Sequence, residues 1–188
     1  MSAESAVLGA IVLPDILTPA QQSALLASAI AYRQNGVLEA NPSGPKRYRA
    51  RLFNTEHCTS LITQLGHEIA VLLGVDQYPI DPYLGWILSY VEPGGFIKPH
   101  IDAQPRYQNS AEKHLRCNLL VQGADPSARP IIDRQVIPVA PRGLWAFFAS
   151  QFPHGTAVLQ GDEPRVVMQY GFAVPQDYQL PTLPARNS

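Results

Sequence analysis

The sequence has few charged residues and no long apolar run. Only 15% of its 188 residues are Asp, Glu, Lys or Arg, and the formal net charge is −1. A near-neutral chain without a basic stripe is not expected to bind nucleic acid or an anionic membrane surface. No run approaches the roughly 18 consecutive apolar residues that a membrane-spanning helix needs. The composition therefore predicts neither a nucleic-acid partner nor a membrane partner.

Cysteine is also scarce. Cys58 and Cys117 lie far apart, in segments whose sequence is typical of buried structure. A disulfide framework is not expected, and a reducing compartment fits better. The segment from Met1 to Ala6 has no basic stretch ahead of an apolar one, so a secretory signal is not expected. Together these features predict a cytoplasmic location.

Proline and glycine, in contrast, are abundant, with 18 and 13 residues. Such a composition favours many short strands and turns over long helices. The length suits one domain, and neither a repeat nor a linker divides the chain. We predict a single domain over residues 1–188, with helical support over about 1–80, a β core over about 83–174 and an irregular tail over 175–188.

Two helices are predicted in the N-terminal part. Thr18 and Pro19 are a capping hydroxyl and a proline at the first helical position, and they predict a helix from Pro19 to Arg33. A second apolar stripe predicts a helix from about Thr55 to Leu73. Between them, Arg47 to Phe53 alternates as a strand does.

The pattern changes after residue 80, where short apolar or alternating runs lie between turn signals. The predicted strands are Leu84 to Val91, Phe96 to Asp102, Leu115 to Gln122, Ile131 to Val139, Gly143 to Ala149, His154 to Leu159 and Arg165 to Val174. Two helices followed by a run of strands predict a mainly β, α+β fold, with the helices packed outside a sandwich or small barrel.

His100, Asp102 and His154 are the strongest candidates for a metal site. Side chains at i and i+2 on a strand point to the same face, so His100 and Asp102 would lie side by side. An imidazole from a later strand, that of His154, would complete the set. Two histidines and one carboxylate on one face suit a non-haem Fe(II) centre that works with oxygen. The alternative is a chance H-x-D pair and a histidine that is only a core residue.

Arg165 follows His154 by eleven residues and opens the next predicted strand. Neighbouring strands would bring both side chains into one cavity, where Arg165 would hold an acidic cosubstrate beside the metal. The alternative is a surface arginine beside Asp162 and Glu163.

Two segments carry a resemblance to a known family. The first segment, from Tyr90 to Asp102, has a tyrosine, a glycine-containing turn and the H-x-D. The second segment runs from Phe147 to His154 and is followed by Gly161 and Arg165. Over about residues 84–172 the chain resembles the Fe(II)/2-oxoglutarate-dependent dioxygenases, and is most similar to their prolyl-hydroxylase-like branch.

The resemblance implies a double-stranded β-helix, or jelly-roll, of eight strands. It implies that His100, Asp102 and His154 hold iron and form the catalytic centre, and that Arg165 pairs with the distal carboxylate of 2-oxoglutarate. The implied reaction consumes molecular oxygen and 2-oxoglutarate, releases succinate and carbon dioxide, and hydroxylates a C–H bond.

Further cosubstrate contacts are expected at Tyr90 and Asn118, which match positions that contact 2-oxoglutarate in similar enzymes. Thr156 is a candidate additional donor. Asn118 shares one strand face with Arg116. Inside a barrel that face would need buried acceptors or a ligand, and the alternative, a solvated face, stays open.

Candidate substrate contacts are Arg116, Arg106 and Trp145. Arg106 follows the H-x-D and is expected on a loop over the mouth of the site. For Trp145, the alternative is ordinary core packing.

A further basic stripe is formed by Arg47, Arg49 and Arg51, which alternate along one predicted strand. They would suit an acidic substrate, but a charged, solvated edge strand is the favoured interpretation. The remaining histidines, His57, His67 and His114, lack metal-ligand spacing and are expected to be structural or exposed.

We expect a small-molecule hydroxylase that acts on an amino acid or similar polar metabolite, because the chain has no appended recognition domain. The first alternative is a peptidyl, prolyl-type hydroxylase acting on a protein partner. A nucleic-acid demethylase is disfavoured by the charge. A cupin-like metal-binding module without oxygen chemistry would leave Arg165 unexplained. Nothing in the sequence indicates an oligomeric state.

Overall fold

The computed structural model describes residues 9–103, 107 and 111–182. Its helices are α1 (Pro19–Gln34) and α2 (Ser60–Leu72), with a short 3-10 turn at Pro126–Ala128. Its strands are β1 (Ala10–Leu13), β2 (Glu39–Ala40), β3 (Arg47–Arg51), β4 (Ile87–Val91), β5 (Glu112–Gln122), β6 (Pro130–Ile132), β7 (Gln135–Val136), β8 (Leu144–Phe148), β9 (His154–Thr156) and β10 (Arg165–Pro175).

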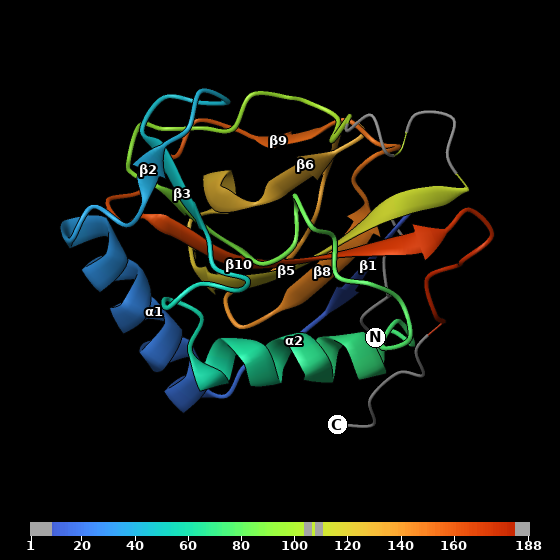
Figure 1. Ribbon diagram of the computed structural model, residues 1–188. Coiled ribbons are helices and arrows are strands. Elements are labelled where there is room, and N and C mark those ends of the chain that lie inside the picture. Colours follow the sequence, from blue (N-terminus) through green and yellow to red (C-terminus); the bar gives the residue numbers. More distant parts are fainter. Residues whose placement is uncertain (1–8, 104–106, 108–110, 183–188) are drawn as a thin grey trace.

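The strands form two antiparallel sheets. The large sheet has seven strands in the order β1-β8-β5-β10-β4-β3-β2, and the small sheet has three in the order β7-β6-β9. In Figure 1 the two helices lie on one side of the large sheet, and β6 and β9 lie on the other. The helices therefore pack outside the sheets, as the sequence predicts.

Alternation along the long central strands β5 and β10 creates two cores. One set of side chains, which includes Leu115, Cys117 and Tyr170, packs beneath the helices. The hydroxyl of Tyr170 donates to the carbonyl of Ile62 in α2 at 3.0 Å and ties helix to sheet. The opposite set packs toward the small sheet in a second core, which includes Trp145 and Ile132. Both faces of these strands are thus buried.

Helix α1 matches its prediction within one residue. The Thr18 side chain accepts from the Gln21 N–H at 3.2 Å, and the Gln21 side chain accepts from the Thr18 N–H at 2.9 Å. This reciprocal pair is a capping box, which satisfies two N–H groups that the first turn leaves unpaired.

Helix α2 begins at Ser60, later than the predicted Thr55. The Thr55 N–H and hydroxyl both bond to the Leu52 carbonyl, at 3.1 and 2.8 Å, and so form a turn instead. Thr59 is the cap, since its side chain accepts from the Ile62 N–H. A local turn therefore competes successfully with the first helical turn.

Three strand predictions need correction. The stretch from Phe96 to Asp102 is not a strand, and its only β-bridge is the isolated one between His100 and His154. The predicted strand from Ile131 to Val139 is the hairpin of β6 and β7, because Asp133 and Arg134 both have positive φ, at 45° and 67°. That conformation is typical of a two-residue hairpin turn.

The strand predicted from His154 to Leu159 ends at Thr156. Strands β1 and β2 are not predicted; with them, the described residues form ten strands. The N-terminal part thus supplies strands to the large sheet as well as both helices. Within the described ranges, neither helix has the length and apolarity that crossing a bilayer requires.

We predict that Thr18→Ala lowers the free energy of unfolding by about 1 kcal/mol, because the first turn of α1 loses its side-chain acceptor. Urea denaturation followed by far-UV circular dichroism measures the change. Thr18→Ser, which keeps the hydroxyl, is the matched control and should lose much less. An unchanged midpoint for Thr18→Ala would show that the capping box contributes no stability.

Candidate active site

The structure brings His100, Asp102 and His154 together. One ligand atom from each lies within 4.8 Å of the others. His100 Nε2 is 3.7 Å from Asp102 Oδ1, and His154 Nε2 is 3.8 Å from Asp102 Oδ2. This spacing is open enough for a metal ion to lie between the three donors.

Backbone contacts hold the two imidazoles in this arrangement. The bridge between His100 and His154 has N–H to carbonyl distances of 3.0 and 2.8 Å. The Nδ1 atom of His100 is 2.8 Å from the Lys98 carbonyl, and that of His154 is 3.1 Å from the Phe152 carbonyl. Bonding through Nδ1 leaves Nε2 of each ring as the ligand atom, the usual role of such outer contacts in metal sites.

The donor set fits a metal ion. His154 Nε2 is buried and has no hydrogen-bond partner among the described residues. A buried nitrogen without a partner is costly unless a ligand satisfies it. Burial lowers the pKa of His154 to about 3 and also lowers that of His100. Both rings are therefore neutral near pH 7, which is the form that binds metals.

Asp102 is kept ionised by Arg116. Burial opposes its ionisation, but the Arg116 guanidinium and the nearby imidazoles hold the pKa of this carboxyl below its usual value. Arg116 Nη2 lies 2.7 Å from Asp102 Oδ2. The sequence predicts that Arg116 contacts the substrate. In the structure Arg116 forms an ion pair with Asp102, one of the candidate metal ligands.

The face of β5 that carries Arg116 and Asn118 points inward. Both side chains are buried, so the solvated alternative is wrong. Gln169 on β10 links them: its Oε1 accepts from Arg116 at 3.4 Å, and its Nε2 donates to the Asn118 oxygen at 3.1 Å. These hydrogen bonds form a network that ends at the ion pair of Arg116 with Asp102.

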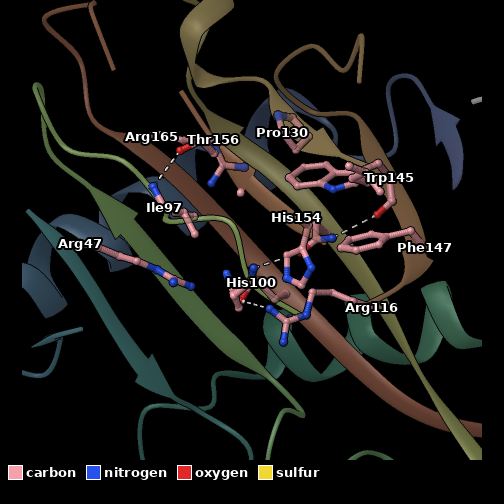
Figure 2. Close-up of a pocket in the computed structure, with 14 residues that line it drawn as sticks. Arg47, Ile97, His100, Arg116, Pro130, Trp145, Phe147, His154, Thr156 and Arg165 are labelled. Atoms are coloured by element: carbon pink, nitrogen blue, oxygen red, sulfur yellow. Dashed lines mark hydrogen bonds between the residues drawn. The ribbon is translucent and has the colours of Figure 1, made fainter. Parts of the chain in front are cut away.

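A cavity adjoins this centre, between the two sheets (Figure 2). It is partly open to solvent and is lined by residues of both sheets. Asn118, Trp145 and Thr156, the candidate cosubstrate and substrate contacts, line it, and Trp145 also packs in the second core. Thr156 Oγ1 already accepts from the Ile97 N–H at 3.0 Å.

Arg165 also lines this cavity and is only 3% exposed, so the surface alternative is wrong. Its Nε donates to the Ala128 carbonyl at 2.6 Å, while its Nη1 is buried without a hydrogen-bond partner in the described structure. Burial, together with the charge of Arg47, lowers the pKa of Arg165 to about 9. A guanidinium in these surroundings is prepared to receive an anion.

Tyr90 does not reach the cavity. Its backbone pairs with Val166, and both side chains point to the core beneath the helices. Its neighbour Ser89 faces the other way and is buried, with a hydroxyl that has no hydrogen-bond partner among the described residues. A one-residue difference reverses the face of a strand residue, which explains the misplacement. Arg106 lies outside the described residues.

Arg47 is a cavity residue that sequence reasoning placed on a solvated edge. Strand β3 is not the edge of the sheet, because β2 pairs outside it. Arg47 pairs with Val91, which pairs with Arg165, so all three positions share one sheet face. The alternation of Arg47, Arg49 and Arg51 indicates that these side chains share one face of the strand, but it does not show whether that face is covered.

His114 was expected to be structural or exposed and is fully buried behind the metal centre. Its Nδ1 lies 3.2 Å from Asp81 Oδ2, and its Nε2 lies 3.9 Å from Asp102 Oδ2. Gly171 makes room for the ring, since a Cβ there would lie 2.6 Å from His114 Cε1. His114 thus packs directly against the carboxylate ligand.

No protein-family model matches this sequence, and no curated protein matches it either. Solved structures do. A prolyl-4-hydroxylase from Pseudomonas putida matches with a TM-score of 0.62 at 15% identity, over 89% of this chain and 93% of that one. HygX from Streptomyces hygroscopicus, with nickel, 2-oxoglutarate and hygromycin B bound, matches with a TM-score of 0.64 at 10% identity, over 92% and 85%.

A prolyl hydroxylase from Trichoplax adhaerens, in complex with a peptide fragment of hypoxia inducible factor, matches with a TM-score of 0.62 at 14% identity, over 89% of this chain and 84% of that one. Identities this low show the fold. The chain has the double-stranded β-helix of the 2-oxoglutarate oxygenases, and the predicted fold class is confirmed.

We predict that the metal-free protein loses stability as pH falls from about 6.5 toward 4. The pKa values of His100, His114 and His154 are all lowered, so the unfolded chain binds protons that the folded one refuses. The slope should reach about 1.4 kcal/mol per pH unit for each fully buried imidazole. His154→Asn should flatten it, whereas His67→Asn, on the exposed surface, should not. Urea midpoints across this pH range measure the effect, and equal slopes for the wild type and His154→Asn would contradict it.

Proposed function

We propose that this protein is an Fe(II)- and 2-oxoglutarate-dependent oxygenase that hydroxylates a C–H bond of a small polar metabolite. The proposal rests on two features that lie beside one cavity. The first is a His-Asp-His set of three donor atoms that can hold a metal ion, and the second is the buried guanidinium of Arg165, which has no anionic partner among the described residues. A simple metal-binding module explains the first but not the second.

His100, Asp102 and His154 would hold the metal by one face, which leaves positions for the cosubstrate and oxygen. Arg165 would receive the distal carboxylate through the fork of its guanidinium, which fixes orientation as well as charge. Bound iron with 2-oxoglutarate would supply the oxidising power, with succinate and carbon dioxide as coproducts. One oxygen atom would enter the substrate and the other would enter succinate.

The surrounding residues have supporting roles in this proposal. Arg116 would keep Asp102 ionised and correctly oriented, since its Nη2 is 2.7 Å from the carboxylate. Trp145 and Phe147 form an apolar wall of the cavity and would exclude water from the reacting atoms. Asn118 would help to position Gln169, to which it is hydrogen-bonded and which in turn accepts from Arg116.

A small-molecule substrate is supported by the small size of the cavity beside the triad. A peptidyl hydroxylase is the second candidate. The observation in its favour is a surface groove beside the edge strand β2, lined by Arg49, Arg51 and His57 among others. An extended peptide can add to such an edge.

The test is succinate formation, followed by proton NMR with Fe(II), 2-oxoglutarate and ascorbate under air. Turnover should be slow alone and rise severalfold with the true substrate, so amino acids, other small acids and proline-containing peptides are compared. Stimulation only by peptides would favour the second candidate. No succinate under any condition, in protein shown to bind Fe(II), would leave a metal-binding module.

We predict that His100→Ala and Asp102→Ala each abolish succinate formation, because each removes one of the three metal ligands. Binding of Mn(II), followed by electron paramagnetic resonance, should fall from one ion per chain to an undetectable level. His67→Ala, a surface histidine on α2, is the matched control. Full turnover of either ligand variant with excess Fe(II) would refute the assignment.

We predict that Arg165→Gln raises the 2-oxoglutarate concentration needed for half-maximal turnover by at least about 30-fold. Losing one partner of a buried, charge-assisted pair costs about 2–5 kcal/mol. Mn(II) affinity should change little, because Arg165 is not a metal ligand. Arg51→Gln, at an exposed position, is the control. An unchanged 2-oxoglutarate requirement would remove Arg165 from the cosubstrate site.

A further inference from the structure

The cavity carries more positive charge than its own acids balance. Arg47, Arg116 and Arg165 line it and are all buried. Asp102, the carboxylate of the candidate metal centre, is already paired with Arg116. Within the described part of the chain, the guanidinium groups of Arg47 and Arg165 therefore remain without a carboxylate partner. Buried charges of this kind are normally paired.

The proposed metal and cosubstrate do not remove this excess. Fe(II) brings two positive charges and 2-oxoglutarate brings two negative ones, so their net contribution is zero. The distal carboxylate of 2-oxoglutarate is assigned to Arg165, and its other end to the metal. One buried cation, Arg47, is then left without an anion.

The surroundings of Arg47 support this conclusion. The residue is 4% exposed, and its Nε is buried without a hydrogen-bond partner in the described residues. Its Nη1 donates to the Ser43 hydroxyl, a neutral acceptor. Burial, followed by the charges of Arg116 and Arg49, lowers the pKa of Arg47 to about 10. Neighbouring charges of the same sign add to the cost of burying this guanidinium until an anion arrives.

Arg47 is also held in position relative to the metal centre. Asn41 accepts from the Ser43 N–H at 3.0 Å, and the Ser43 carbonyl accepts from the Lys98 N–H at 2.8 Å. Gly44 makes this docking possible, because a Cβ there would lie 1.8 Å from the Phe96 carbonyl oxygen. The loop before β3 is thus fastened to the segment that leads to His100. In Figure 2 the Arg47 side chain extends from β3 toward the centre of the cavity.

We propose that Arg47 binds a carboxylate of the primary substrate, and that the substrate is therefore a small carboxylic acid. This inference rests on the proposed function, and it names a substrate class and a specificity-determining residue. A planar guanidinium matches a carboxylate through two parallel hydrogen bonds. Binding there would place the substrate on the side of the cavity opposite Trp145, between the two sheets (Figure 2).

The test uses protein loaded with Mn(II) and 2-oxoglutarate, which retains the metal centre without turnover. Small monocarboxylates, such as phenylacetate and N-acetylglycine, are compared with their neutral primary amides. Paramagnetic relaxation of ligand protons by Mn(II) reports binding close to the metal, independently of activity. The wild type should bind the acids at least about tenfold more tightly than the amides, as expected for a charge-assisted pair.

Arg47→Gln should reduce this preference to less than about threefold, and Arg47→Lys, which keeps the charge but not the fork, should retain part of it. The 2-oxoglutarate affinity of Arg47→Gln should stay within about threefold of the wild type, whereas Arg165→Gln should lose it. Arg134→Gln, at an exposed arginine in the turn between β6 and β7, is the control and should leave both affinities unchanged. Thermal melts confirm that each variant is folded.

Two results would overturn the inference. A wild type that binds acids and amides equally has no carboxylate site. A loss of 2-oxoglutarate affinity in Arg47→Gln as large as in Arg165→Gln would make Arg47 part of the cosubstrate site, with the proposed function intact. If instead the wild type binds no 2-oxoglutarate, the proposed function fails; the acid preference and its dependence on Arg47, measured on protein with Mn(II) alone, then decide the inference separately.

Discussion

Strands β5 and β10 are buried on both faces, and the rest of the molecule depends on this constraint. One face must be apolar throughout, because it packs under α1 and α2. The other face is free to carry polar groups only if they satisfy one another or a ligand. Arg116, Asn118 and Gln169 meet much of this condition by bonding to one another and to Asp102, although Nε of Arg116 has no hydrogen-bond partner among the described residues. The period of two along a strand thus separates the residues that stabilise the fold from those that do chemistry.

Electrostatic balance then decides which residues of the polar face can act. Asp102 is ionised because Arg116 is beside it, and the imidazoles are neutral because they are buried. Arg47 and Arg165 have no such internal partner and are left for incoming anions. A cavity that is too positive by itself is suited to two acidic molecules, one held at each guanidinium. Burying two unpaired guanidinium groups is unfavourable, and the apolar core on the opposite face offsets this free energy.

Much of this arrangement is predictable from the sequence. The triad, Arg165 and the capping of α1 follow from local spacing, and the structure brings these residues to the expected places. Tyr90 fails because its face depends on the register with Val166, which local sequence does not encode. Arg47 fails for another reason: whether a polar strand residue is covered depends on the neighbouring strands, here β2. For the same reason the sequence leaves open whether His114 is structural or exposed, and the contact with Asp81 shows that it is structural. The start of α2 and the hairpin at Asp133 reflect local turns that compete with regular structure.

The bridge between His100 and His154 has a consequence for how the protein matures. It attaches the segment bearing two donors to β9 of the small sheet, while Asp102 is paired across to β5 of the large one. A metal ion bound by His100, Asp102 and His154 would therefore link the two sheets. The metal ion would then bind after the two sheets have packed together. The sheets would separate more easily in the metal-free protein.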